Sequence, residues 1–162
     1  MTSASSPRLL CIGHRGAMGH APENTLGSVK AALALGVRHL EIDVYCVEGE
    51  LLVFHDDRLE RTTNGTGRIR DQSLSHLRSL DAGGGQQIPT LEEVCTEIAG
   101  KACLNIELKG PGTARPVARL INQLIARGWH HDCFLVSSFD HRQLAEMGQM
   151  EPRIKLGALL CG

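Results

Sequence analysis

The stretch His39-Leu40-Glu41-Ile42-Asp43-Val44 alternates polar and apolar side chains. Successive side chains of a β-strand point to opposite faces, so the three aliphatic residues share one face and the two carboxylates share the other. The segment from Leu104 to Lys109 repeats this pattern, with Asn105, Glu107 and Lys109 on its polar face. The sequence therefore predicts two strands that each have one apolar and one polar face.

Strand and helix signals alternate along the rest of the chain. Strands are expected at residues 9–13, 37–44, 51–55, 102–109, 134–137 and 154–160. Helices are expected at residues 25–35 (capped by Asn24), 73–80, from 90 onward, 113–127 and 140–147. This order favours a parallel sheet, and a doubly wound sheet is the default at 162 residues. Strands of a doubly wound sheet are apolar on both faces, however, so the alternation favours a barrel whose polar face points into its mouth.

Composition limits the class of protein. Hydrophobic residues make up 42% and charged residues 22%, as in ordinary globular domains. The net charge of -1 gives no field for nucleic acid or anionic membrane. No apolar run approaches the roughly 20 residues that span a bilayer. Residues 1–8 are expected to be a disordered tail without a secretory signal, and the six cysteines are expected to be buried, reduced thiols of a cytoplasmic protein.

The polar faces of the two alternating strands bring three carboxylates together, from Glu41, Asp43 and Glu107. Three such groups at one mouth would repel and would resist ionising together, and a divalent cation would relieve this. All-oxygen ligands favour Mg²⁺ or Ca²⁺ over zinc. From these residues alone a second interpretation stays open, in which the carboxylates are surface groups in salt bridges.

Two other predicted strands each end in a histidine, His14 and His55. Functional groups of parallel barrels gather at the carboxyl ends of strands, and histidine is the usual proton shuttle near neutral pH. Arg15 offers a fork for phosphate oxygens and Lys109 a point charge, so the set suits phosphoryl transfer. A single histidine is more often structural, and we interpret His130-His131 as a solvated turn rather than a metal site.

A series of motifs appears in order along the chain. The motifs are His14-Arg15-Gly16, Pro22-Glu23-Asn24-Thr25, Glu41-Ile42-Asp43-Val44, His55-Asp56, Arg61-Thr62-Thr63-Asn64-Gly65-Thr66-Gly67, Ile88-Pro89-Thr90-Leu91-Glu92-Glu93, Glu107-Leu108-Lys109 and Ser137-Ser138-Phe139. This series resembles that of the glycerophosphodiester phosphodiesterase family. The resemblance covers nearly the whole chain, and the ordered set is far more specific than any single motif.

The resemblance implies a TIM-type (β/α)8 barrel over residues 9–162, with a small insertion at about 56–87 after the third strand. It implies an enzyme that hydrolyses small-molecule glycerophosphodiesters to glycerol 3-phosphate and an alcohol, with one divalent cation, Mg²⁺ or Ca²⁺. By position, Glu41, Asp43 and Glu107 would hold the metal, and His14 and His55 would be the general acid and base. Arg15 and Lys109 would bind the phosphate, and Asn24 would help to orient the site.

The chain is short for this fold. A TIM-type barrel takes about 250 residues, and the sixth expected strand ends almost at Gly162. We expect this chain to lack the last two strands and to associate with itself through an open barrel edge. Two alternatives to the hydrolase remain. One is a lyase-type phospholipase acting on lysolipids, and the other is a non-catalytic fragment.

Overall fold

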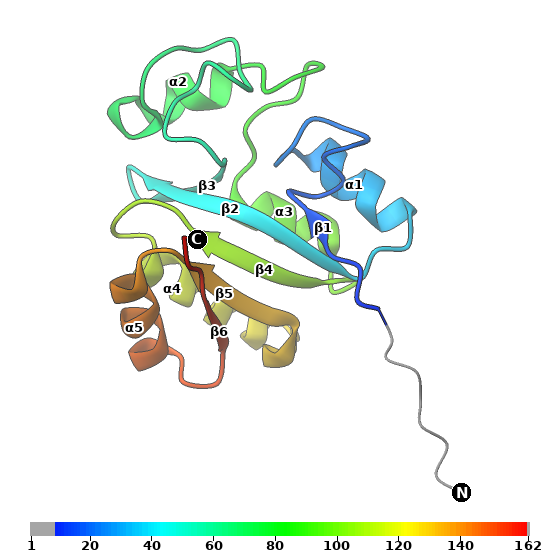
Figure 1. The fold of residues 1–162 in the computed structure, drawn as a ribbon, viewed down its shortest axis with the longest axis vertical. Coiled ribbons are helices and arrows are strands. Elements are labelled where there is room, and N and C mark those ends of the chain that lie inside the picture. Colours follow the sequence, from blue (N-terminus) through cyan, green and yellow to red (C-terminus); the bar gives the residue numbers. More distant parts are fainter. Residues whose placement is uncertain (1–8, 162) are drawn as a thin grey trace, which may run out of the picture.

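A single sheet organises the chain in the computed structural model, which describes residues 9–161 (Figure 1). The tail expected at residues 1–8 lies outside the described residues. The strands are β1 (Gly13–His14), β2 (His39–Val47), β3 (Glu50–Val53), β4 (Cys103–Leu108), β5 (Phe134–Ser138) and β6 (Lys155–Ala158). β1, β2, β4, β5 and β6 lie side by side in that order, and all four pairings are parallel.

The third strand runs in the opposite direction to its neighbour. β3 pairs with β2 antiparallel, with Val44 opposite Val53, and lies off the path of the parallel strands. The expectation that all six strands are parallel is therefore wrong for this one. A two-residue turn, Glu48-Gly49, joins β2 and β3 with φ of 50° and 86°. Two positive φ angles are the mark of the turn that closes a tight hairpin.

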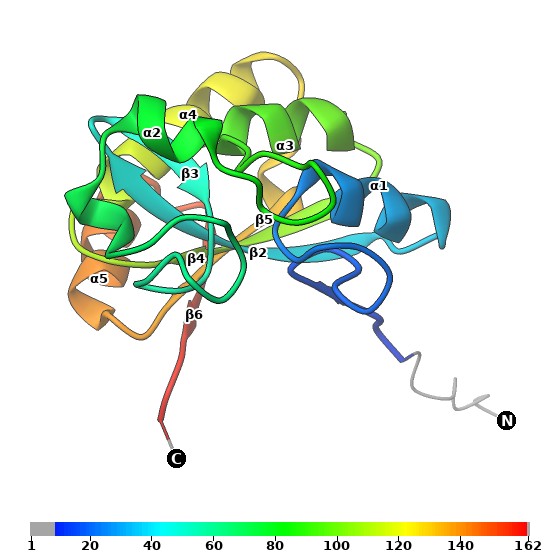
Figure 2. The same cartoon turned by 90° about the horizontal axis from the view of Figure 1, so that it is seen from above.

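Helices cover one face of the sheet. They are α1 (Leu26–Ala34), α3 (Leu91–Ile98), α4 (Ala114–Ala126) and α5 (His141–Met150), whereas α2 (Leu74–Ser79) belongs to the segment after β3. Figure 2 shows α1, α3 and α4 along the same side of the sheet. No helix in the described range is long and apolar enough to cross a membrane.

The main core lies between the sheet and these helices. Leu40, Ile42 and Val44 of β2 are fully buried in it, and Leu104, Ile106 and Leu108 of β4 are also buried. In β4 the burial alternates residue by residue, with Asn105 and Glu107 partly exposed on the other face. The predicted division of β4 into an apolar and a polar face is confirmed.

The segment after β3 has a core of its own. In Figure 1 it lies beyond β3, around the short helix α2. Its buried residues are Tyr45, Val47, Leu52, Phe54, Leu59, Ile69, Leu77, Leu80, Ala82 and Ile88. Several of these belong to β2 and β3, so the segment packs against the hairpin. This packing holds the segment after His55 against the β2–β3 hairpin.

Capping residues set the beginning of two helices, α1 and α3. Thr90 caps α3 in a reciprocal capping box with Glu93, as predicted. The cap of α1 is Thr25, which forms a capping box with Ser28. The expectation that Asn24 caps α1 is therefore wrong. Asn24 has a left-handed backbone, with φ of 56°, and its side chain is turned toward the sheet instead.

Some edge regions differ from the prediction. Of the expected first strand, residues 9–13, only Gly13 pairs with β2, together with His14 after it. Leu10 and Ile12 before them are 62% and 51% exposed, because nothing in the described chain covers them. The cysteines are all free, but only Cys95 is buried, while Cys11 and Cys161 are exposed. The expectation of buried thiols is wrong for the other five.

Candidate active site

Three carboxylates meet on the face of the sheet that the helices do not cover. Glu41 and Asp43 belong to β2 and Glu107 to β4, where the register places Asp43 beside Glu107. One oxygen from each carboxylate lies within 4.8 Å of one from each of the others. Parallel pairing of the two alternating strands therefore brings the three predicted metal ligands together.

These carboxylates are poorly solvated. Glu41 is 8% exposed and Asp43 is 1% exposed. Burial, and next the charge of Asp43, raise the pKa of Glu41 to about 7. Burial also raises the pKa of Asp43. Glu41 Oε1 and Asp43 Oδ1 are buried without a hydrogen-bond donor among the described residues.

The other carboxylate oxygens are held by neighbours that the sequence analysis had selected. The Asn24 side-chain amide donates to Asp43 Oδ2 at 2.9 Å. The Arg15 backbone N–H donates to Glu41 Oε2 at 3.0 Å. Lys109 Nζ donates to Glu107 Oε1 at 2.9 Å and lies 3.8 Å from Asp43 Oδ1. The charges of the triad are thus only partly balanced by protein groups.

The loop that carries Arg15 is tied to the beginning of α1. Arg15 has φ of 51°, which is uncommon outside glycine, and its carbonyl accepts hydrogen bonds from Asn24 N–H and the Ser28 hydroxyl. Gly16 follows with φ of 79°, and a Cβ there would lie 2.4 Å from Ser28 Oγ. The glycine of the His-Arg-Gly motif is required by this close approach.

The two candidate histidines reach the site by different routes. His14 lies at the end of β1, with Nε2 3.8 Å from Glu41 Oε2, and its side chain is 59% exposed. His55 follows β3, which does not run parallel to the others, so the argument from parallel strand ends fails for it. The antiparallel strand instead returns along β2, where Phe54 N–H donates to the Asp43 carbonyl at 2.9 Å. His55 therefore comes back to the level of Asp43.

Three further residues connect to this group. Glu23, Asp56 and Arg61 form hydrogen bonds with one another or with Arg15 and His55. All three lie in the ordered motifs, and sequence reasoning gave none of them a role. The ordered motifs were the signal that could have drawn attention to them.

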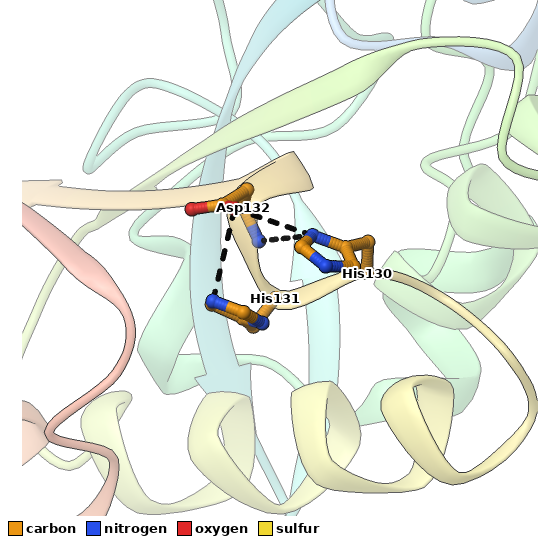
Figure 3. Close-up of side chains that lie close together, drawn as sticks. All are labelled: His130, His131 and Asp132. Carbon is orange, nitrogen blue, oxygen red and sulfur yellow. Dashed lines mark hydrogen bonds and ion pairs between the residues drawn. The ribbon is translucent and has the colours of Figure 1, made fainter.

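A second cluster of potential ligands lies elsewhere, in the turn before β5 (Figure 3). His130 Nδ1 and His131 Nε2 lie 3.4 Å and 3.7 Å from Asp132 Oδ2. His130 Nδ1 already accepts the Asp132 backbone N–H, and the other Asp132 oxygen is 3.3 Å from Lys155 Nζ. The cluster is largely exposed and its groups are partnered, which fits the predicted solvated turn.

The triad, by contrast, fits a divalent cation. Its ligands are carboxylate oxygens, which a hard ion prefers. Two of these oxygens are buried without a donor, and an unpaired buried acceptor is costly unless something else satisfies it. A bound cation would supply that partner and would reverse the upward shift of the Glu41 pKa.

Parallel strands with helices on one face and functional side chains near the carboxyl ends of the strands are typical of the TIM-type barrel class. Residues 14–161 match the model of the "Glycerophosphoryl diester phosphodiesterase family". The chain therefore belongs to the glycerophosphoryl diester phosphodiesterase family, and the resemblance inferred from the motifs is confirmed.

Relatives and solved structures agree with this assignment. The chain is 36% identical to a glycerophosphodiester phosphodiesterase of Caldanaerobacter subterraneus, over 96% of this chain and 68% of the relative. It is 32% identical to one of Bacillus subtilis, over 96% of this chain and 61% of the relative. The structure of an Oleispira antarctica phosphodiesterase in complex with the product sn-glycerol-3-phosphate superimposes with a TM-score of 0.83 and 36% identity, over 93% of this chain and 66% of that one.

The chain thus spans about two thirds of the length of the relatives that it matches. The five parallel strands β1, β2, β4, β5 and β6 form the corresponding part of the barrel, and β3 lies off their path. An eight-stranded barrel therefore has three more strands than the five described, not the two expected from the sequence.

Proposed function

We propose that the protein hydrolyses glycerophosphodiesters to glycerol 3-phosphate and an alcohol, with one divalent cation, Mg²⁺ or Ca²⁺. The observation that carries the proposal is the carboxylate triad, which has two buried, unpartnered oxygens and is flanked by Arg15 and Lys109. Family membership and the product named for the Oleispira antarctica structure support the choice of substrate.

Each residue has a proposed part. Glu41, Asp43 and Glu107 would hold the cation, which when bound supplies positive charge to stabilise the phosphate of the transition state. Arg15 and Lys109 add positive charge beside it, with Arg15 Nε 3.6 Å from Asp43 Oδ2. Asn24 holds Asp43 in place through its amide.

His14 and His55 are the proposed general acid and base. They follow strands that pair along the same edge of β2, β1 at Leu40 and Glu41 and β3 at Val44 to Val47, so the two imidazoles occupy two separate positions along β2. This allows one imidazole to take a proton from the attacking hydroxyl while the other gives a proton to the departing alcohol oxygen. The pH dependence of the rate in the two single-histidine variants identifies which imidazole is the acid and which is the base.

The test is release of glycerol 3-phosphate from glycerophosphocholine, with Mg²⁺, with Ca²⁺ and with chelator. Release should need a cation and should fall at least about 100-fold in His14→Ala, the scale of general acid–base catalysis. His76→Ala is the matched control, because His76 is exposed on α2. Release that survives both the chelator and His14→Ala would overturn the proposal, and a cyclic phosphate as the final product would indicate a lyase.

A further inference from the structure

Arg61 joins two carboxylates that the proposed chemistry leaves without a role. Its Nη1 and Nη2 donate to Glu23 Oε2 and Oε1 at 2.8 Å and 2.6 Å. Its Nε and Nη2 also donate to Asp56 Oδ2 and Oδ1 at 2.5 Å and 2.9 Å. One guanidinium thus forms a bidentate contact with each of two acids from different segments. Such paired contacts fix geometry as well as charge.

Each of these carboxylates also contacts a residue of the proposed site. Glu23 Oε1 accepts from Arg15 Nη1 at 2.7 Å. Asp56 Oδ1 lies 2.6 Å from His55 Nδ1. The five residues therefore form an unbroken series of hydrogen bonds from Arg15 through Glu23, Arg61 and Asp56 to His55. We call this series the Arg61 network.

The contact with Asp56 decides which nitrogen of His55 carries the proton. Arg61, more than any other group, lowers the pKa of Asp56 to about 2, so this carboxylate is ionised at neutral pH. An ionised carboxylate only accepts hydrogen bonds, so a neutral His55 must carry its proton on Nδ1. Its Nε2 lone pair is then free to receive a proton.

The contact between Arg61 and Glu23 keeps a second carboxylate ionised, and this one holds Arg15. Arg61 also lowers the pKa of Glu23 to about 2, so this acid is ionised too. It holds the Arg15 guanidinium by one nitrogen, Nη1. The Arg15 side chain is 14% exposed, so its remaining N–H donors have little access to solvent and face the proposed site.

We propose that Glu23, Arg61 and Asp56 are positioning residues that hold His55 in the Nδ1–H tautomer and set the Arg15 guanidinium against the phosphate. Arg61 is the member that connects the two. The inference rests on the proposed function for the parts played by His55 and Arg15. A purely structural role, fastening the segment after β3 to the loop before α1, would affect stability alone.

The first test needs no activity. Nitrogen-15 NMR of the histidine-labelled chain reports the tautomer of neutral His55, with its signals assigned by their loss in His55→Gln. We expect the Nδ1–H tautomer in the wild type and a shift toward the Nε2–H tautomer in Asp56→Ala. A wild-type His55 that is mainly Nε2–H, or a tautomer unchanged in Asp56→Ala, overturns the inference. It would do so even if the hydrolase proposal holds.

The second test separates positioning from stability. Arg61→Ala should lower kcat by about 10- to 100-fold, the range for residues that orient a site ligand, with KM changed less than kcat. Guanidinium added at millimolar concentration should restore part of this rate. Arg61→Lys should restore little of it, because an ammonium cannot form two bidentate contacts.

Arg78→Ala is the matched control for the second test. Arg78 forms a bidentate pair with Glu93 at 2.6 Å and 2.8 Å, away from the site. Its loss should lower the melting temperature without lowering kcat. If Arg61→Ala behaves as Arg78→Ala does, the network is structural and the inference fails. If no form of the chain is active, the hydrolase proposal is in question and the NMR result alone decides the inference.

Discussion

Asn24 has an unusual backbone and a specific task. Its φ of 56° is tolerated by asparagine better than by most residues, and its amide donates to the most buried carboxylate of the triad, Asp43. Strained residues cluster at functional sites, where the surrounding structure holds them in place. Here Thr25 caps α1, which leaves the Asn24 side chain free for Asp43.

Replacing Asn24 should therefore weaken cation binding. We expect Asn24→Gly to lower the affinity for Mg²⁺ or Ca²⁺ by about 10- to 100-fold, the range for residues that orient a metal ligand. Glycine accepts the positive φ, so this variant isolates the loss of the amide. Asn24→Ala adds backbone strain and should also be less stable. Titration calorimetry measures both variants, and an unchanged affinity in Asn24→Gly would mean that the amide does not support the metal site.

The raised pKa of Glu41 predicts how stability depends on pH. Folding raises this pKa from 4.5 to about 7, so between these values the folded state binds more protons than the unfolded state. The contribution of Glu41 to the stability of the metal-free chain should therefore be greatest below about pH 4.5. This contribution should be lost as pH rises through 7. The slope for one such group is at most about 1.4 kcal/mol per pH unit.

Cation binding needs the ionised carboxylate, so it should reverse this trend. Added Mg²⁺ or Ca²⁺ should raise the melting temperature more at pH 8 than at pH 5.5, and a chelator should remove the gain. Glu41→Gln should flatten the metal-free pH dependence. Thermal unfolding followed by circular dichroism checks this, and a metal-free melting temperature that rises steadily from pH 5.5 to 8 would contradict it.

At the scale of elements, the loop before α1 depends on one glycine. Gly16 has φ of 79° and lies so close to Ser28 that a Cβ would be 2.4 Å from its hydroxyl oxygen. Gly16→Ala should therefore reduce the free energy of unfolding by about 1–3 kcal/mol from backbone strain alone. Gly19→Ala is the control, since no atom lies within 4 Å of the added Cβ. Urea unfolding measures both, and equal effects would show that the loop adjusts freely.

The alternating pattern of β2 and β4 was enough to predict the carboxylate triad. Residues two apart on a strand share a face, and parallel pairing of two such strands then brings Asp43 beside Glu107. Strand direction was not predictable in the same way, because alternation is identical in parallel and antiparallel strands. The direction of β3 is set by the turn Glu48-Gly49, whose glutamate is a less common choice at positive φ than asparagine.

The position of His55 shows the same limit. The sequence indicated a histidine at a strand end, but its nearness to Asp43 depends on the hairpin and on hydrogen bonds formed across it. The Arg61 network is still less visible in sequence, because its hydrogen-bonded partners Glu23 and Arg61 are 38 residues apart. Long side chains meet there only after the segment that follows β3 has packed on its own small core.

For the whole molecule, apolar side chains are exposed at both edges of the sheet. Beside β1, Leu10 and Ile12 are 62% and 51% exposed, and on and after β6, Leu156 and Leu160 are 40% and 79% exposed. An edge strand also presents unpaired backbone groups to another chain. We therefore expect this chain to self-associate at micromolar concentration.

Light scattering coupled to size-exclusion chromatography checks this expectation. The double variant Leu156→Glu with Leu160→Glu should reduce the apparent mass. Leu35→Glu is the control, because Leu35 is 59% exposed at the end of α1, a helix that lies beside β1 and not beside β6 (Figure 1). A monomeric wild type, or an equal effect of the control, would rule out association through the β6 edge.

All eight proposed site residues lie between His14 and Lys109; seven are on or next to the first four strands, and Asn24 lies in the loop before α1. A ribosome adds about 5–20 residues per second, so the amino-terminal part of a chain emerges first. The nascent chain therefore exposes every proposed cation and phosphate ligand once Lys109 has left the exit tunnel, while α4, β5 and β6 have yet to emerge from it. A cation captured at that stage would fasten β2 to β4 before the rest of the described sheet emerges.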